Sequence, residues 1–162
     1  MTHEFNDPFK ELEQSVIEDM KKRYSEKTID HFLNPRNLGR IAAPDGFARV
    51  VSTRGNTMEI YLKVKDGRIT NASFWTDGCG CAIAAGSVAT ELAKQKTAFQ
   101  AQRITPQDIL EALEGLPDDD AHNALLAANA LKVAIIDYFA SQNDPWKRAY
   151  RSSRSSTHDE NP

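Results

Sequence analysis

Two cysteines one residue apart, Cys79 and Cys81, are the side chains of this chain best suited to bind a metal ion or to carry sulfur. Gly78 and Gly80 flank the first of them, and glycine allows both a positive φ and a close approach of the backbone to another group. Residues 82–89 are small and apolar, which predicts a helix buried on most sides. We therefore expect both thiols in a tight loop at the amino end of a buried helix, where free N–H groups and the helix dipole favour a thiolate.

The bulk composition is that of an ordinary globular protein. The chain has 162 residues, 40% of them hydrophobic and 27% charged, which is enough for one domain with a core. A net charge of −3 gives no reason to expect nucleic-acid binding. The absence of a run of about 18 apolar residues predicts no membrane-spanning helix. The polar start is not a signal peptide, and two neighbouring cysteines are no disulfide framework, so we expect a cytoplasmic protein with free thiols or a metal site.

The first part of the chain is predicted to be helical. Asp7 and Pro8 are typical of a helix start, and apolar residues at helical spacing predict an amphipathic helix to about Lys22. We interpret its apolar stripe as core packing, with a partner surface as the alternative. A second helix is expected to start at Ser25 and to end before Pro35.

Three strands are predicted next, at 47–53, 57–65 and 68–76. Apolar and polar residues alternate in the middle strand, so that one face of it is expected to be buried. Asp66 and Gly67 are a strong signal for a two-residue hairpin. The result is a three-stranded antiparallel sheet, whose last strand leads into the Cys79 loop.

The second half is predicted to be helical, with helices at 82–94, from Thr105 to Gly115, and from His122 to about Ala140. The three aspartates at 118–120 are interpreted as capping and solvated residues. The fold class is therefore α+β, a three-stranded antiparallel sheet packed against helices with an extra N-terminal amphipathic helix. We predict a helical extension at 1–23, a single domain at 24–142 and a disordered tail at 143–162.

Three segments of the sequence resemble the IscU/NifU-type iron–sulfur cluster assembly scaffolds. They are YSEKTIDHFLNPRNLG at 24–39, GNTMEIYLKVKDGRITNASFWTDGCGCAIAAGS at 55–87 and HNALLAANALKVAIIDY at 122–138. They occur in the same order as in the family and cover most of the chain. The resemblance implies the α+β fold that the residue pattern also predicts.

The family holds its cluster or a zinc ion with residues of three loops. The first loop carries Cys-Gly-Asp, and here Arg54 and Asn56 stand in place of its cysteine and its aspartate. The second carries Gly-Cys-Gly, which Cys79 matches. The third carries His-Cys, of which His122 is kept and Asn123 replaces the cysteine. The family's usual ligand set is therefore incomplete in this chain.

Two further departures lie close to these loops. Cys81 occupies a position at which the family commonly has a small or polar residue. Asp120 replaces the lysine of the family's Leu-Pro-Pro-Val-Lys chaperone segment, of which Leu116 and Pro117 are kept. Arg54 would bring a positive charge to the mouth of the site, where it either stabilises a thiolate or repels a cation.

The resemblance implies Cys79 and His122 as ligands. The Cys-Gly-Cys spacing adds Cys81 as a third ligand, and Asp77 is a further candidate. They would hold iron or a [2Fe–2S] cluster, with zinc as the alternative, and would leave one position open for water or a partner. Each residue also has a structural interpretation: the thiols can be packing cysteines, and the histidine can be an exposed residue at a helix start.

We therefore expect a scaffold or carrier that binds iron and sulfide transiently and passes the cluster on, and not an enzyme. Its partners would be a cysteine desulfurase and cluster-accepting proteins, with a homo-oligomer as a further expectation and neither nucleic acid nor membrane as a partner. The alternative is a degenerate scaffold that acts as a zinc-binding or metal-free interaction module. A third hypothesis is a persulfide carrier that uses Cys79 as acceptor.

Overall fold

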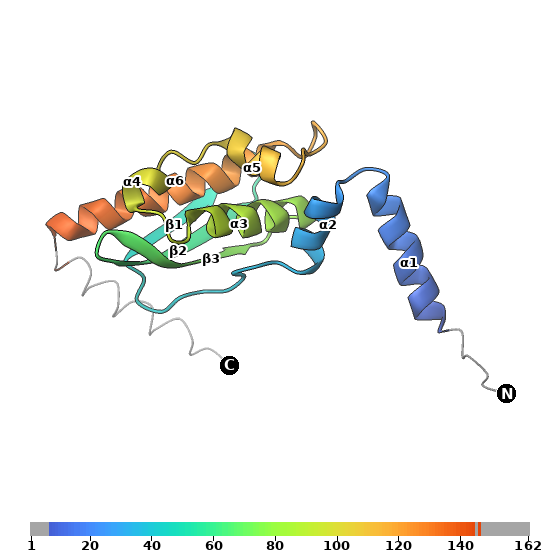
Figure 1. Ribbon diagram of the computed structural model, residues 1–162, viewed down its shortest axis with the longest axis horizontal. Coiled ribbons are helices and arrows are strands. Elements are labelled where there is room, and N and C mark those ends of the chain that lie inside the picture. The colour runs from blue at the N-terminus through green and yellow to red at the C-terminus, as the bar shows by residue number, and fades with distance from the viewer. Residues whose placement is uncertain (1–6, 145, 147–162) are drawn as a thin grey trace.

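The computed structural model describes residues 7–144 and 146 (Figure 1). In chain order the elements are α1 (Pro8–Lys21), α2 (Glu26–Leu33), β1 (Gly46–Val51), β2 (Thr57–Lys65), β3 (Arg68–Thr76), α3 (Gly80–Ala93), α4 (Ala98–Ala101), α5 (Pro106–Ala112) and α6 (His122–Asn143). The predicted α+β class is confirmed. The short α4, closed by a capping box between Thr97 and Gln100, was not predicted. The tail predicted at 143–162 lies almost entirely outside the described residues.

The sheet is antiparallel in the order β1-β2-β3, as predicted. Asp66 and Gly67, at the hairpin between β2 and β3, have φ of 54° and 75°. These two positive angles fit the primed turn that the Asp-Gly pair predicts. β1 ends two residues earlier than predicted because Ser52 already belongs to the following turn, where its Oγ accepts hydrogen bonds from the Arg54 and Asn56 amides.

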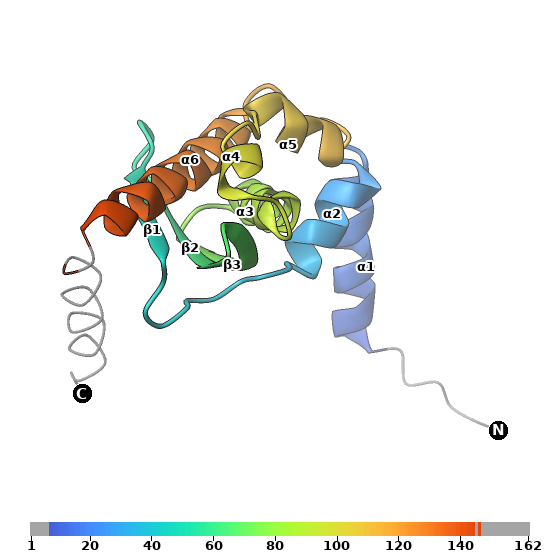
Figure 2. The same ribbon diagram turned by 60° about the vertical axis from the view of Figure 1, so that its left-hand side comes forward.

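Helices cover one face of the sheet (Figures 1 and 2): α6 packs on β1 and β2, and α3 packs on β3. By length and composition alone, α6 is the one helix of the described part of the chain that could cross a membrane. Half of its most apolar stretch is buried inside the protein, however, because α6 also packs against α3 and α5. It is a core helix of the domain.

The connection from α2 to β1 crosses the other face of the sheet. It begins beside β3, where Gly39 donates to the Phe74 carbonyl, and reaches β1 at Asp45, which donates to the Leu62 carbonyl. In between, Arg40 forms an ion pair with Glu59 at 3.1 Å. Glu59 and Tyr61 are therefore buried, although strand alternation alone predicts a solvated face.

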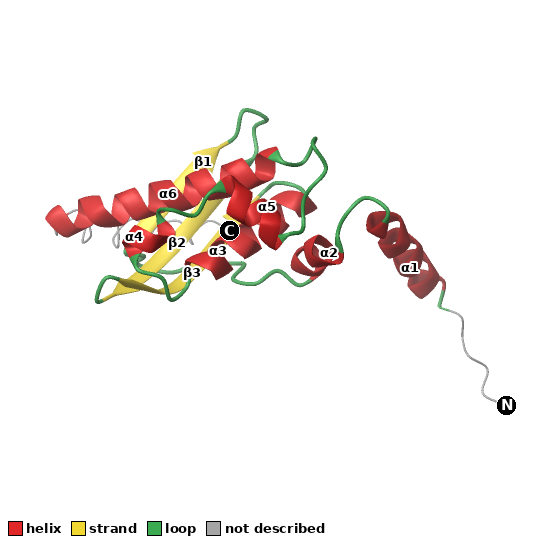
Figure 3. Cartoon of the chain, turned by 45° about the horizontal axis from the view of Figure 1, so that its top comes forward, coloured by secondary structure: helices red, strands yellow, loops and turns green. Residues whose placement is uncertain are grey.

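The N-terminal helix α1 forms as predicted, with Asp7 as its N-cap and Pro8 at its first position. The prediction that its apolar stripe packs into the core is wrong: no residue of α1 is buried, and Phe9, Leu12 and Val16 are exposed. The physical reason is that α1 stands away from the sheet beyond α2 (Figures 1 and 3). Its last turn, at Met20, lines a pocket described below.

Candidate metal centre

The cysteine loop leads directly from β3 into α3, with Cys79 as the N-cap residue of the helix. Cys81 therefore lies in the first helical turn. Neither Gly78 nor Gly80 has a positive φ, so of the two properties of glycine only the close approach is used here. They are needed for close packing: a Cβ at Gly80 would lie 2.7 Å from the Phe32 ring, and one at Gly78 would lie 2.6 Å from the Ala82 Cβ.

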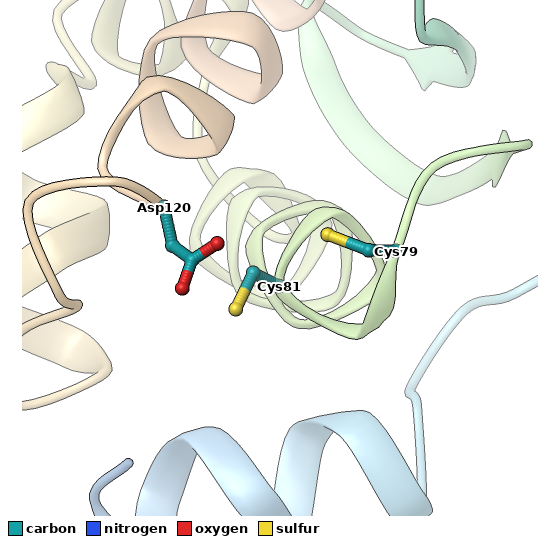
Figure 4. Close-up of side chains that lie close together, drawn as sticks. All are labelled: Cys79, Cys81 and Asp120. Atoms are coloured by element: carbon teal, nitrogen blue, oxygen red, sulfur yellow. The ribbon is translucent and has the colours of Figure 1, made fainter. Parts of the chain in front are cut away.

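The two thiols lie together with a carboxylate (Figure 4). Cys79 is exposed and Cys81 is buried, with 5% of its surface accessible. One ligand atom each of Cys79, Cys81 and Asp120 lies within 4.8 Å of the other two. Among the described residues, this is the group in which three sulfur, imidazole or carboxylate donors meet.

Asp120 is held in this group by residues from the other end of the sequence. Its Oδ2 accepts a hydrogen bond of 3.0 Å from the Tyr24 hydroxyl and pairs with Arg23 at 3.4 Å. Only 16% of its side chain is exposed, and the N-cap of α6 is Ala121, without a side-chain cap. The prediction that Asp120 is a capping and solvated residue is therefore wrong, whereas Asp119, at 87% exposure, does face solvent.

The other two loops that the resemblance singles out also reach this place. The Arg54 guanidinium donates to the Asp119 carbonyl at 3.4 Å. The Asn123 amide nitrogen donates to the Asp120 carbonyl at 3.0 Å and lies 4.0 Å from the Cys79 Sγ. Asn123 is fully buried, and its Oδ1 has no hydrogen-bond partner among the described residues. Arg54 and Asn123 thus lie at the periphery of the same centre without offering it a thiolate.

Two of the predicted ligands do not belong to the three-donor group. Nδ1 of His122 lies 2.9 Å from the Asp119 carbonyl oxygen. Because a carbonyl oxygen can only accept a hydrogen bond, the proton of the neutral ring is on Nδ1 and the lone pair is on Nε2. The Asp77 carboxylate accepts a hydrogen bond of 2.7 Å from the Thr57 amide, so it fastens β2 to the cysteine loop. Both residues stay predicted ligands, and the carboxylate that lies with the thiols is Asp120.

A pocket of about 210 Å³ opens beside the thiols. Met20 at the end of α1 and Ile29 and Phe32 of α2 supply apolar side chains to its wall. The lining residues are Met20, Tyr24, Thr28, Ile29, Phe32, Cys79, Gly80 and Cys81. The pocket leads from solvent to the buried thiol.

The expectation that the amino end of α3 favours a thiolate is wrong for Cys81, because its surroundings favour the protonated sulfur. Burial is the main cause that raises the pKa of the Cys81 thiol from its ordinary 9.0 to about 11, and the negative charge of Asp120 adds to it. A hydrogen bond from Tyr24 to the Cys81 sulfur acts in the opposite direction. Burial and the bond to Asp120 in turn raise the pKa of Tyr24 to about 12. Cation binding at Cys81 therefore has to release a proton, and its affinity should rise with pH.

Asp120→Asn is expected to lower the pKa of Cys81 in the metal-free protein, because it removes a negative charge from beside the thiolate. Burial remains, so the pKa should stay above 9.0. Titration of thiolate absorbance in a Cys79→Ser background isolates this thiol, and Asp119→Asn is the matched control because Asp119 is exposed. An unchanged or raised pKa in the Asp120 variant would show that the carboxylate does not act on Cys81.

The three donors suit a single cation of intermediate softness. Thiolates and carboxylates are both ligands of Zn²⁺, and three protein ligands leave a fourth position open for water or another donor. A [2Fe–2S] cluster is ordinarily held by four thiolates. Within one chain, the two thiolates and one carboxylate would complete only part of that set.

Comparison with known proteins places the chain in a family. Residues 23–145 match the family described as NifU-like N terminal domain. The protein named iron-sulfur cluster assembly scaffold protein IscU 1 of Archaeoglobus fulgidus is 51% identical over 117 residues, which are 72% of this chain and 76% of that protein. The protein of Escherichia coli K12 named iron-sulfur cluster assembly scaffold protein IscU is 46% identical over 120 residues, 71% of this chain and 93% of that protein.

A solved structure shares the fold. The crystal structure of a nitrogen-fixing NifU-like protein (N-terminal) from Brucella abortus superposes with a TM-score of 0.58 at 23% identity, over 75% of this chain and 97% of that one. The match to the family over 23–145 and the high identity to two of its members agree with the three sequence segments. The chain belongs to the family of IscU/NifU-type iron–sulfur cluster assembly scaffold proteins.

Proposed function

We propose that this chain is an iron–sulfur cluster assembly scaffold or carrier that binds iron and sulfide transiently and passes them on. The observation that carries the proposal is the meeting of Cys79, Cys81 and Asp120 at the amino end of α3. The scaffold names of its relatives support the same function. We expect assembly rather than enzymatic turnover, because the relatives are named scaffold proteins.

Cys81 and Asp120 take the place of the donors that this chain lacks at Arg54 and Asn123. Three donors leave at least one cluster position to be filled by solvent, by a second copy of the chain or by a partner. Such an open position suits a protein that has to release its cargo. The expected partners are a cysteine desulfurase, which supplies sulfur, and proteins that accept the cluster, and the expected compartment is the cytoplasm.

Anaerobic reconstitution with ferrous iron, sulfide and a reductant tests the proposal. The wild type should acquire visible charge-transfer absorption together with protein-bound iron and sulfide, and Cys79→Ala should lose both. Asp119→Ala is the control, because its side chain is exposed beside the site. Failure of the wild type to bind iron and sulfide, or full binding by Cys79→Ala, would contradict the proposal.

A second candidate is a module that holds zinc, or no metal, and acts through protein contacts. The observation that favours it is the replacement of two thiolates by Arg54 and Asn123 at loops that still reach the site. Metal analysis of protein purified without added iron distinguishes the zinc-binding module from the metal-free one. Capture of a cysteine desulfurase that survives the double change of Cys79 and Cys81 to alanine would favour the metal-free version.

A further inference from the structure

Tyr24 is held between α1 and α2, beside the metal centre. Its amide donates to the Met20 carbonyl at 2.8 Å, and the next residue, Ser25, is the N-cap of α2. The first turn of α2 is fastened to the end of α5, because the Thr28 hydroxyl donates to the Leu113 carbonyl at 3.1 Å. Both of these residues are buried, so the backbone that carries Tyr24 is fixed to the core of the domain.

The Tyr24 hydroxyl contacts two of the three donors of the centre. It donates a hydrogen bond of 3.0 Å to Oδ2 of Asp120, and it is also hydrogen-bonded to the Cys81 sulfur. The Arg23 guanidinium pairs with the same carboxylate oxygen at 3.4 Å. Tyr24 and Arg23 therefore both bind Oδ2 of Asp120, and neither of them occupies Oδ1.

The hydroxyl is the stronger of these two restraints on Asp120. The Arg23 side chain is 53% exposed, and exposed ion pairs contribute little because water and salt screen them. The hydrogen bond from Tyr24 reaches a carboxylate that is largely buried, where a bond to a charged acceptor is strong. Loss of the hydroxyl would therefore remove most of the restraint that keeps the Asp120 side chain beside the sulfurs.

His122 is the donor that competes with Asp120 for the third position of the centre. It follows Asp120 by two residues and begins α6. Its Nδ1 lies against the Asp119 carbonyl, so its Nε2 keeps a lone pair that can bind a cation. Imidazole and carboxylate are both ordinary zinc ligands. The choice between the two residues is therefore decided by which of them is held beside the thiols.

We propose that Tyr24 is the positioning residue that makes Asp120, and not His122, the third ligand of the centre. Its hydroxyl holds Oδ2 and so keeps the carboxylate beside the two thiols before a cation arrives. Without the hydroxyl the carboxylate turns away more easily, and the His122 imidazole takes part of its place. The inference rests on the proposed function, since it concerns the same centre.

Zinc affinity and zinc-edge X-ray absorption of the full-length, iron-free protein test the inference. Tyr24→Phe removes the hydroxyl and keeps the ring. It should weaken zinc binding by about 10-fold, as is typical when a residue that hydrogen-bonds to a metal ligand is lost. Both sulfur neighbours should remain, and imidazole scattering that the wild type lacks should appear. Tyr61→Phe is the matched control, because it removes a hydroxyl bonded to the buried Glu59 carboxylate on the other face of the sheet.

A double variant distinguishes positioning from a general structural role. In an Asp120→Ala background, Tyr24→Phe should have no further effect on zinc affinity, because no carboxylate is left to position. A residue that only stabilises the fold would lower the affinity by the same factor in both backgrounds. The unfolding midpoint of each metal-free variant verifies that it is folded.

Three outcomes would overturn the inference. They are wild-type zinc affinity in Tyr24→Phe, an equal loss of affinity with and without Asp120, and a Tyr24→Phe spectrum that lacks imidazole. Iron and sulfide take no part in these measurements, so the result is independent of cluster reconstitution. A wild type that binds iron and sulfide, together with a Tyr24→Phe variant that binds zinc as tightly as the wild type, would refute this inference alone.

Discussion

Cys81→Ala is expected to weaken zinc binding by at least about 100-fold near neutral pH. Loss of a residue that only hydrogen-bonds to a metal ligand typically weakens binding by about 10–100-fold, and loss of the ligand itself should cost at least as much as the upper end of that range. The variant leaves one thiolate and one carboxylate, which fall short of the three protein ligands of a typical open zinc site. Zinc is a suitable probe because it takes the same donors and does not change oxidation state. Competition with a chromogenic chelator measures the affinity.

Cys79→Ala should show a similar loss, and Cys81→Ser tests whether the sulfur itself is needed, since serine keeps the shape of the side chain. The competing interpretation is that Cys81 is a buried packing residue. Under that interpretation Cys81→Ala would keep the wild-type zinc affinity while Cys79→Ala loses it. That pattern would remove Cys81 from the site.

Asp120→Ala is expected to weaken zinc binding by roughly 10–100-fold, and His122→Ala by clearly less. The reason is the geometry: the Asp120 carboxylate lies within 4.8 Å of both sulfurs, whereas the His122 ring is occupied at Nδ1 by the Asp119 carbonyl. The affinities are measured by the same chelator competition. Asp119→Ala is the matched control, because it removes an exposed carboxylate from the adjacent position.

The reverse order of effects would assign the third ligand to His122. Asp120 lies in the loop just before α6 and His122 is the first residue of α6, so a movement of this junction could exchange one for the other. A double variant distinguishes exchange from a single fixed ligand. If each residue substitutes for the other, the double variant should lose much more affinity than the two single losses combined.

The sequence was sufficient for the fold and for the thiol pair. Turns and helix caps are determined by residues that are close in the sequence, so they can be predicted without knowledge of the tertiary structure. Examples are the hairpin at Asp66, the caps at Asp7 and Ser25 and the start of α5 at Thr105. The cysteines were identified by their spacing and by the apolar helix after them. Their place at the N-cap and first turn of α3 is close to that expectation.

Asp120 could not be identified in the same way. In the sequence it is the last of three aspartates before a helix, a pattern typical of solvated caps. Its contacts with Arg23 and Tyr24 span 97 and 96 residues, and these contacts separate it from Asp119. The burial of Glu59 and Tyr61 was missed for a related reason, because an irregular connection covers the outer face of the sheet.

X-ray absorption at the zinc edge of the zinc-loaded, full-length protein tests the proposed centre most directly. Two sulfur neighbours at about 2.3 Å and carboxylate or water oxygen at about 2.0–2.2 Å are predicted, without the outer-shell scattering of an imidazole. Asp120→Ala should change the oxygen shell and leave both sulfurs in place. A spectrum with fewer than two sulfurs, or with imidazole scattering that disappears in His122→Ala, would contradict the assignment of Cys79, Cys81 and Asp120 as the metal ligands.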